Sequence, residues 1–168
     1  IDYALSPSKS DELDLALAAN CLFWIATSSG AHLMASVFRK FICCTNMALP
    51  FMFNATGAPN QIGIPKLYVY KSNQSLVKFS EIYSSGASEF RMPSDFEDSP
   101  YSLIDNTPKQ LLDIVKESLM RVTGLWISPP DYHSLQKSLN QLIPAHSLTY
   151  GSYSLCGYEF IKSYTFLL

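Results

Sequence analysis

The chain has few charged residues for its length. Charged side chains make up 15% of its 168 residues, and the formal net charge is −2, whereas globular proteins carry about 25% charged residues. Lysines and arginines are scattered, with Arg39 and Lys40 as the one adjacent basic pair. Because nucleic-acid binding needs a basic patch, we expect no nucleic-acid partner. The apolar content of 48% points instead to a sheet buried on both faces, or to a surface that a partner covers.

Cysteine motifs are missing as well. The four cysteines are Cys21, Cys43, Cys44 and Cys156. No two of them have the C-x-x-C spacing, which excludes the usual zinc and dithiol motifs. We therefore expect buried free thiols and a reducing, cytoplasmic location.

Several other motifs are absent. The sequence contains neither of the two commonest phosphate loops, G-x-G-x-x-G and the Walker lysine pattern, nor a G-x-S-x-G nucleophile elbow. Its first residues lack the basic start and apolar core of a signal peptide. The apolar stretch 41–58 is broken by Asn46, Pro50 and Asn54, so we expect no transmembrane segment. Because residues 1–4 resemble the end of a strand, we expect a fragment truncated at its amino terminus.

Residues 21–46 carry the strongest structural pattern. Two apolar runs, 21–26 and 41–45, are joined through a small-residue turn and a helix expected at 31–39. This βαβ pattern predicts parallel strands in a sheet that helices cover on both faces. The expected fold class is therefore α/β, a Rossmann-like half-domain with a mostly parallel sheet.

The turn between the first strand and its helix consists of Thr27, Ser28, Ser29 and Gly30. In parallel sheets ligands bind beyond the carboxyl ends of the strands, which is where this turn is expected. Free N–H groups at the helix start, hydroxyl donors and a glycine suit a phosphate or diphosphate, and His32 in the first turn is within reach of it. The alternatives are plain helix capping by these hydroxyls, and a capping or half-buried neutral role for His32.

The rest of the chain alternates helices, strands and two long loops. Helices are expected at 11–20, 75–84, 108–123 and 131–142, strands at 66–71 and 101–104, and irregular structure at 47–65 and 85–98. The clearest helix start is the capping box formed by Thr107 and Gln110, with Pro108 in the first helical position. Residues 149–168 are expected to pack on the sheet as an aromatic tail.

An ordered set of short motifs resembles a family of bacterial putative glycosyltransferases. The motifs are Asp-Tyr-Ala-x-Ser-Pro-x-Lys-Ser at 2–10, Thr-Ser-Ser-Gly at 27–30, Thr-Asn at 45–46 and Asn-Thr-Pro at 106–108. That family is similar to the carboxyl-terminal, donor-binding half of GT-B glycosyltransferases, which bind a nucleotide sugar between two Rossmann-like halves. The resemblance implies that residues 1–148 hold the donor diphosphate for transfer to a glycan acceptor, in glycan or surface-polysaccharide assembly. It also implies that the general base lies on the other half.

Further residues enter as candidates for binding the nucleotide or sugar. Lys9 and Ser10 belong to a loop expected near the nucleotide, and Asn46 ends a strand at the same sheet edge as the 27–30 turn. Glu81 is a candidate for a ribose hydroxyl. A turn-forming role for Asn46 and a solvated helix position for Glu81 are the alternatives. The acidic residues at 95–98 lack metal-ligand spacing, so we expect no metal and no cofactor besides the nucleotide-sugar substrate.

Two departures from the family pattern leave other functions open. Ala26 stands where such turns begin with Gly, and residues 39–41 replace a Gly-x-Pro junction. UDP-N-acetylglucosamine 2-epimerases use a similar Ser-Gly turn, but they follow it with an acidic pair that this chain lacks at 31–34. The third interpretation is a non-catalytic nucleotide-binding module that forms a homodimer and buries an exposed sheet edge.

Overall fold

The computed structural model describes residues 3–27, 30–48, 60–90, 92–147, 149–151 and 155–168. Its main sheet has four parallel strands in the order β1-β2-β3-β6. Their bounds are Phe23–Ala26 for β1, Phe41–Met47 for β2, Gln61–Pro65 for β3 and Leu155–Cys156 for β6. Ala26 pairs with Cys44, Cys44 with Gly63 and Gly63 with Cys156. The parallel β1–β2 pair confirms the βαβ prediction.

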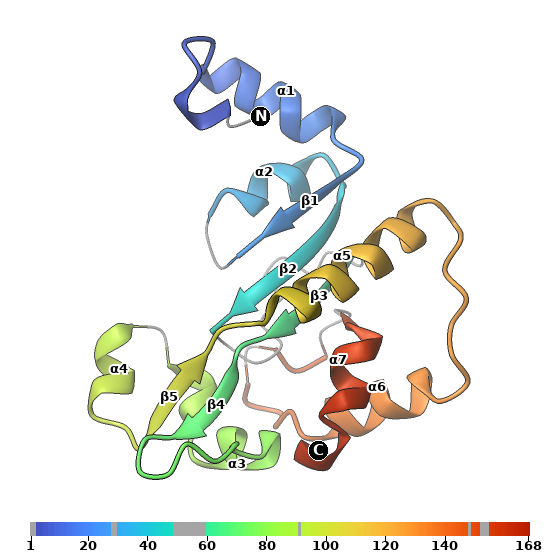
Figure 1. Ribbon diagram of the computed structural model, residues 1–168. Coiled ribbons are helices and arrows are strands. Elements are labelled where there is room, and N and C mark those ends of the chain that lie inside the picture. The colour runs from blue at the N-terminus through green and yellow to red at the C-terminus, as the bar shows by residue number, and fades with distance from the viewer. Residues whose placement is uncertain (1–2, 28–29, 49–59, 91, 148, 152–154) are drawn as a thin grey trace.

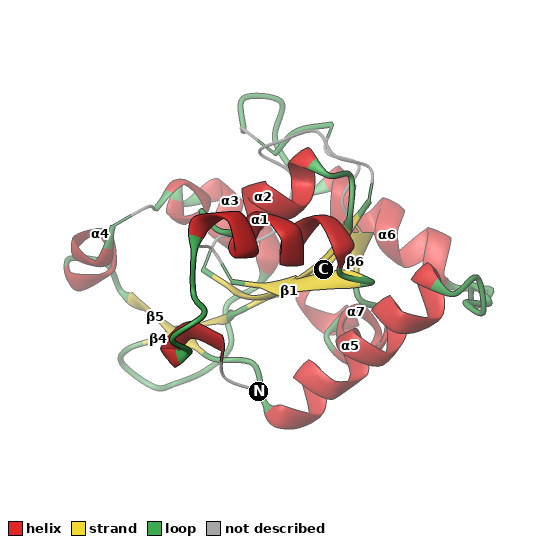
Figure 2. Cartoon of the chain, turned by 90° about the horizontal axis from the view of Figure 1, so that it is seen from above, coloured by secondary structure: helices red, strands yellow, loops and turns green. Residues whose placement is uncertain are grey.

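Helices cover both faces of this sheet. Figure 2 shows α1 (Asp11–Asn20) and α2 (His32–Val37) on one side of it, and α5 (Pro108–Val122) and α7 (Tyr158–Ser163) on the other. The remaining long helix, α6 (Tyr132–Gln141), packs beside α7. The α/β class with a parallel sheet flanked by helices is therefore confirmed.

The core lies between the sheet and α5. Ile42 and Ile62 on neighbouring strands and Ile114 on α5 are all buried. Cys43 and Cys44 are also buried, and desolvation raises the pKa of Cys43 to about 11 and that of Cys44 to about 12. All four cysteines are free thiols, as expected.

A second, two-stranded sheet lies beyond the carboxyl end of β3. Its strands β4 (Leu67–Tyr70) and β5 (Tyr101–Ile104) are antiparallel. Between them the chain forms α3 (Phe79–Ser84) and α4 (Pro93–Glu97), and Figure 1 shows this group at the opposite end of the molecule from α1. Three short 3-10 helices complete the described elements: η1 (Tyr3–Leu5), η3 (Ala87–Glu89) and η4 (Thr165–Leu167).

Three segments differ from the sequence prediction. Residues 61–65, expected to be irregular, form the fully buried strand β3. The helix expected at 75–84 begins only at Phe79, since Leu76 is held in a bridge with Val69 on β4. The expected loop at 85–98 contains η3 and α4.

The carboxyl-terminal segment 149–168 adds β6 to the main sheet and then forms α7. Within the described part of the chain, no helix combines the length and apolar character needed to cross a membrane.

Candidate functional site

The carboxyl ends of β1 and β2 lie side by side, and the predicted binding residues follow them. Ala26 ends β1, and the hydroxyl of Thr45 on β2 donates to its carbonyl oxygen at 3.3 Å. Thr27 leads into the turn after β1, while Asn46 is the penultimate residue of β2. The structure thus brings the 27–30 turn and Asn46 to one edge of the sheet.

The turn itself is described at its two ends. Thr27 and Gly30 are exposed, whereas Ser28 and Ser29 lie outside the described residues. A Cβ added at Gly30 would meet no atom within 4 Å, so the backbone there has open space beside it. The helix α2 starts at the half-buried His32, and its N-cap residue Ala31 provides no side-chain hydrogen bond.

The start of α5 reaches the same edge, and the link is a pair of asparagines. The N–H of Asn106 donates to Asn46 Oδ1, and the N–H of Asn46 donates to Asn106 Oδ1, both at 2.7 Å. Asn106 Nδ2 donates to the carbonyl oxygen of Pro65 at the end of β3, also at 2.7 Å. Asn106 therefore ties the ends of β2 and β3 to the start of α5.

The predicted capping box begins α5 immediately after Asn106. The Thr107 hydroxyl accepts the N–H of Gln110 at 3.3 Å, and Gln110 Oε1 accepts the N–H of Thr107 at 2.7 Å. The hydrogen bonds of Asn106 place the N-terminus of the 15-residue α5 at the carboxyl edge. The positive end of the helix dipole therefore lies there. Sequence reasoning identified this helix start but did not place it at the site.

Lys9 and Ser10 lie at the start of α1, away from Glu81. The Ser10 hydroxyl accepts the N–H of Leu13 at 3.2 Å and so caps α1, and Lys9 Nζ is 3.3 Å from Asp14 Oδ2. Figure 1 places α1 and the helix that carries Glu81 at opposite ends of the chain's fold. The structure does not bring these three candidates together.

Glu81 on α3 faces two tyrosines of the second sheet. Its Oε1 accepts the hydroxyl of Tyr70 in a short hydrogen bond and the hydroxyl of Tyr101 at 3.1 Å. The carboxylate of Glu81 beside it raises the pKa of Tyr70 to about 12. These contacts give Glu81 a packing role between α3 and the β4–β5 sheet.

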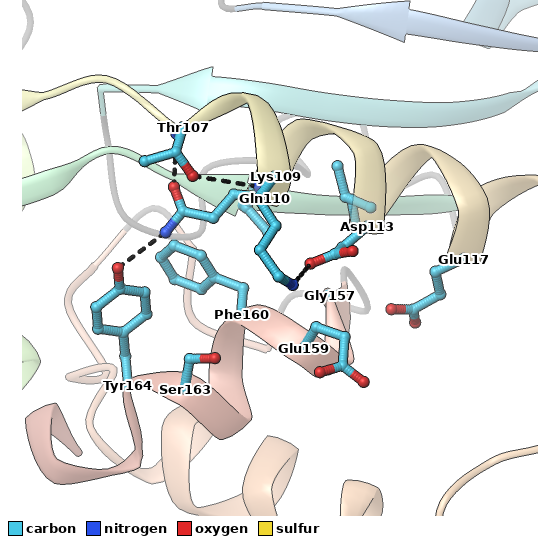
Figure 3. Close-up of a pocket in the computed structure, with 12 residues that line it drawn as sticks. Thr107, Lys109, Gln110, Asp113, Glu117, Gly157, Glu159, Phe160, Ser163 and Tyr164 are labelled. Atoms are coloured by element: carbon cyan, nitrogen blue, oxygen red, sulfur yellow. Dashed lines mark hydrogen bonds and ion pairs between the residues drawn. The ribbon is translucent and has the colours of Figure 1, made fainter.

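Sequence reasoning missed a pocket between α5 and α7, drawn in Figure 3. Its volume is about 240 Å³. One cation, Lys109, and three carboxylates line it, and Lys109 Nζ is paired with Asp113 Oδ2 at 2.6 Å. The other carboxylates belong to Glu117, which is buried, and Glu159, which is exposed. This balance of charge disfavours an anionic ligand in the pocket.

The described part of the chain contains no group of three or more His, Cys, Asp or Glu side chains arranged to hold a metal ion. Comparison of the chain with protein-family models, with curated proteins and with solved structures finds no match.

Proposed function

We propose that the chain binds the diphosphate of a nucleotide-sugar donor at the carboxyl edge of its parallel sheet, as the donor-binding half of a GT-B-type glycosyltransferase. The observation that carries this proposal is the convergence of three elements on that edge. They are the turn after β1 with Thr27 and Gly30, the Asn46 amide at the end of β2, and the start of α5 at Thr107.

The groups at this edge are suited to an anion because they are donors. Thr27 is exposed and carries a hydroxyl donor, Gly30 leaves room for close approach, and the positive end of the α5 dipole lies at this edge. The last described residues of β1 and β2, from Ala26 to Thr27 and from Thr45 to Met47, include no carboxylate, and the acidic first turn of α1 lies on a separate element toward the carboxyl end of β1. The acidic α5–α7 pocket is the less suitable place for phosphate.

In the proposed reaction the nucleoside diphosphate is the leaving group. The bond between the sugar's anomeric carbon and the phosphate oxygen breaks as the acceptor hydroxyl attacks, and the hydroxyl proton passes to a base. Negative charge then grows on the departing diphosphate, and preorganised N–H and O–H donors stabilise it. The described residues contribute this stabilisation, and we assign none of them as the base.

Ligand-induced stabilisation tests the proposal. The unfolding midpoint is measured with a panel of UDP-, GDP-, ADP- and CMP-sugars, and a ligand at 100 times its Kd stabilises by about 2.7 kcal/mol. We expect a response to at least one diphosphate sugar and none to the CMP-sugars, which lack a diphosphate. Gly30→Asp should abolish the response, whereas the neutral Gly30→Asn should weaken it less, because it fills the space beside Gly30 without adding a negative charge. A wild-type protein that responds to no nucleotide sugar would contradict the proposal.

We infer self-association through β1 as a second candidate function. β1 is an edge strand of the main sheet; Ile25 on it is 52% exposed, and Leu22 just before it is 61% exposed. Unpaired edge strands are templates for pairing with another chain.

The charge distribution favours a second copy of this chain as the partner. Figure 1 shows α1 running opposite to β1, so its acidic first turn (Asp11, Glu12) lies toward the carboxyl end of β1. Arg39 and Lys40 directly precede β2, whose first residue, Phe41, pairs with the first residue of β1. Antiparallel pairing of two β1 strands would therefore place acidic groups of one copy opposite basic groups of the other.

A further inference from the structure

The hydrogen bonds between Asn46 and Asn106 determine how the Asn46 amide is oriented. A backbone N–H can only donate, so the Asn46 atom that faces the N–H of Asn106 at 2.7 Å must be the oxygen, Oδ1. The same argument fixes Asn106, whose Oδ1 faces an N–H and whose Nδ2 faces a carbonyl oxygen. Neither amide can be turned over without losing a bond.

This orientation leaves the Asn46 Nδ2 group available. Among the described residues it has no hydrogen-bond partner, and the Asn46 side chain is only half buried. Asn46 has a left-handed backbone with φ 50°, a conformation that asparagine adopts more readily than most residues. The bonds to Asn106, which is 6% exposed, therefore hold a free N–H donor at the carboxyl edge before any ligand binds.

We propose that Asn46 Nδ2 donates a hydrogen bond to a phosphate oxygen of the ligand and that Asn106 is the positioning residue for this donor, an inference that rests on the proposed function. With Oδ1 bonded to Asn106, the ligand atom that meets Nδ2 must be an acceptor. The neighbouring Thr27 hydroxyl can donate too, and the positive end of the α5 dipole lies at the same edge. This set matches the oxygens of a diphosphate better than a nucleobase edge, which mixes donors and acceptors.

The variant Asn46→Asp removes the Nδ2 donor while keeping the hydrogen bond that supports the fold. An aspartate keeps an oxygen for the N–H of Asn106 and tolerates the left-handed backbone, but it replaces Nδ2 by a negatively charged oxygen. We expect the unfolding midpoint to change little. Binding of inorganic pyrophosphate and of UDP, measured by titration calorimetry, should weaken by about tenfold or more, because a hydrogen bond to a charged group is lost. Asn46→Gly, which keeps the backbone and removes the amide without adding charge, should also weaken both.

A double-mutant cycle tests the positioning role of Asn106. Asn106→Ala should weaken pyrophosphate binding in the wild-type background but add no further loss in the Asn46→Gly background, since Asn106 acts through the Asn46 amide. An equal loss in both backgrounds would overturn the positioning role. If Asn46→Asp and Asn46→Gly both bind with wild-type affinity, the assignment of Asn46 as a donor is overturned, while the proposed function still stands. Wild-type protein that binds neither pyrophosphate nor UDP, GDP or ADP would instead overturn the proposed function.

Discussion

Glu117 on α5 accepts the backbone N–H of Tyr158 at the start of α7, with 2.8 Å between Oε2 and the nitrogen. Its other oxygen, Oε1, accepts hydrogen bonds from Nε and Nη2 of Arg121, at distances of 2.9 and 2.6 Å. The Arg121 guanidinium lies over the rings of Trp126 and Tyr132, 4.5 and 5.2 Å from their centroids. Burial raises the pKa of Glu117, and these donors oppose that rise. A carboxylate that is 5% exposed thus joins α5 to the β6–α7 segment.

We predict that Glu117→Ala destabilises the fold. The substitution leaves a buried N–H at Tyr158 and the Arg121 charge without their acceptor, and breaking a buried ion pair from one side costs about 3 kcal/mol. The free energy of unfolding, measured by urea titration, should fall by about that amount. Glu159→Ala is the matched control, because this carboxylate lines the same pocket but is exposed, and its effect should stay within about 0.5 kcal/mol. Equal effects of the two variants would contradict the prediction.

Thiol reactivity provides a second prediction. Burial raises the pKa of Cys43 to about 11 and that of Cys44 to about 12, and it raises that of the fully enclosed Cys156 well above its ordinary value. Because the thiolate is the reactive form, these groups should resist alkylation in the native protein. Cys21, which is half buried at the end of α1, should react.

The measurement is mass spectrometry after iodoacetamide treatment at mildly alkaline pH. One label per chain is expected in the native state and four after unfolding, matching the four cysteines of the chain. Cys21→Ser should remove the native label. Labelling of Cys43, Cys44 or Cys156 at the rate seen in the unfolded chain would show that the core around them opens.

The sequence predicted those helices and strands that are determined by residues close to one another in the chain. The start of α5 follows from Thr107 and Gln110 within four residues of sequence, and β1 and β2 follow from continuous apolar runs. The strand β3 gives no such signal, because its sequence, Gln-Ile-Gly-Ile-Pro, contains both Gly and Pro. It becomes a strand because β2 and β6 pair with it on its two sides.

The site was predictable only in part for the same reason. The 27–30 turn and Asn46 could be assigned to one sheet edge, since parallel strands end together. Asn106 lies 60 residues from Asn46, and nothing in the intervening sequence indicates that the two amides meet. From the sequence Glu81 is a candidate for binding ribose, but in the structure it contacts Tyr70 and Tyr101. These contacts depend on how α3 packs against the second sheet, which the local sequence does not indicate.

The third prediction concerns the β1 edge. If two copies pair through β1, Ile25→Lys should give a monomer, because a charged side chain on an edge strand opposes pairing with another chain. Size-exclusion chromatography with light scattering measures the mass over a range of concentrations, and circular dichroism checks that the variant is folded. Val37→Lys is the matched control, since Val37 is 78% exposed on α2 rather than on the strand, and it should remain dimeric. A wild-type protein that is monomeric at every concentration would rule out the dimer. A dimer that survives Ile25→Lys but not Val37→Lys would move the interface from the strand to α2.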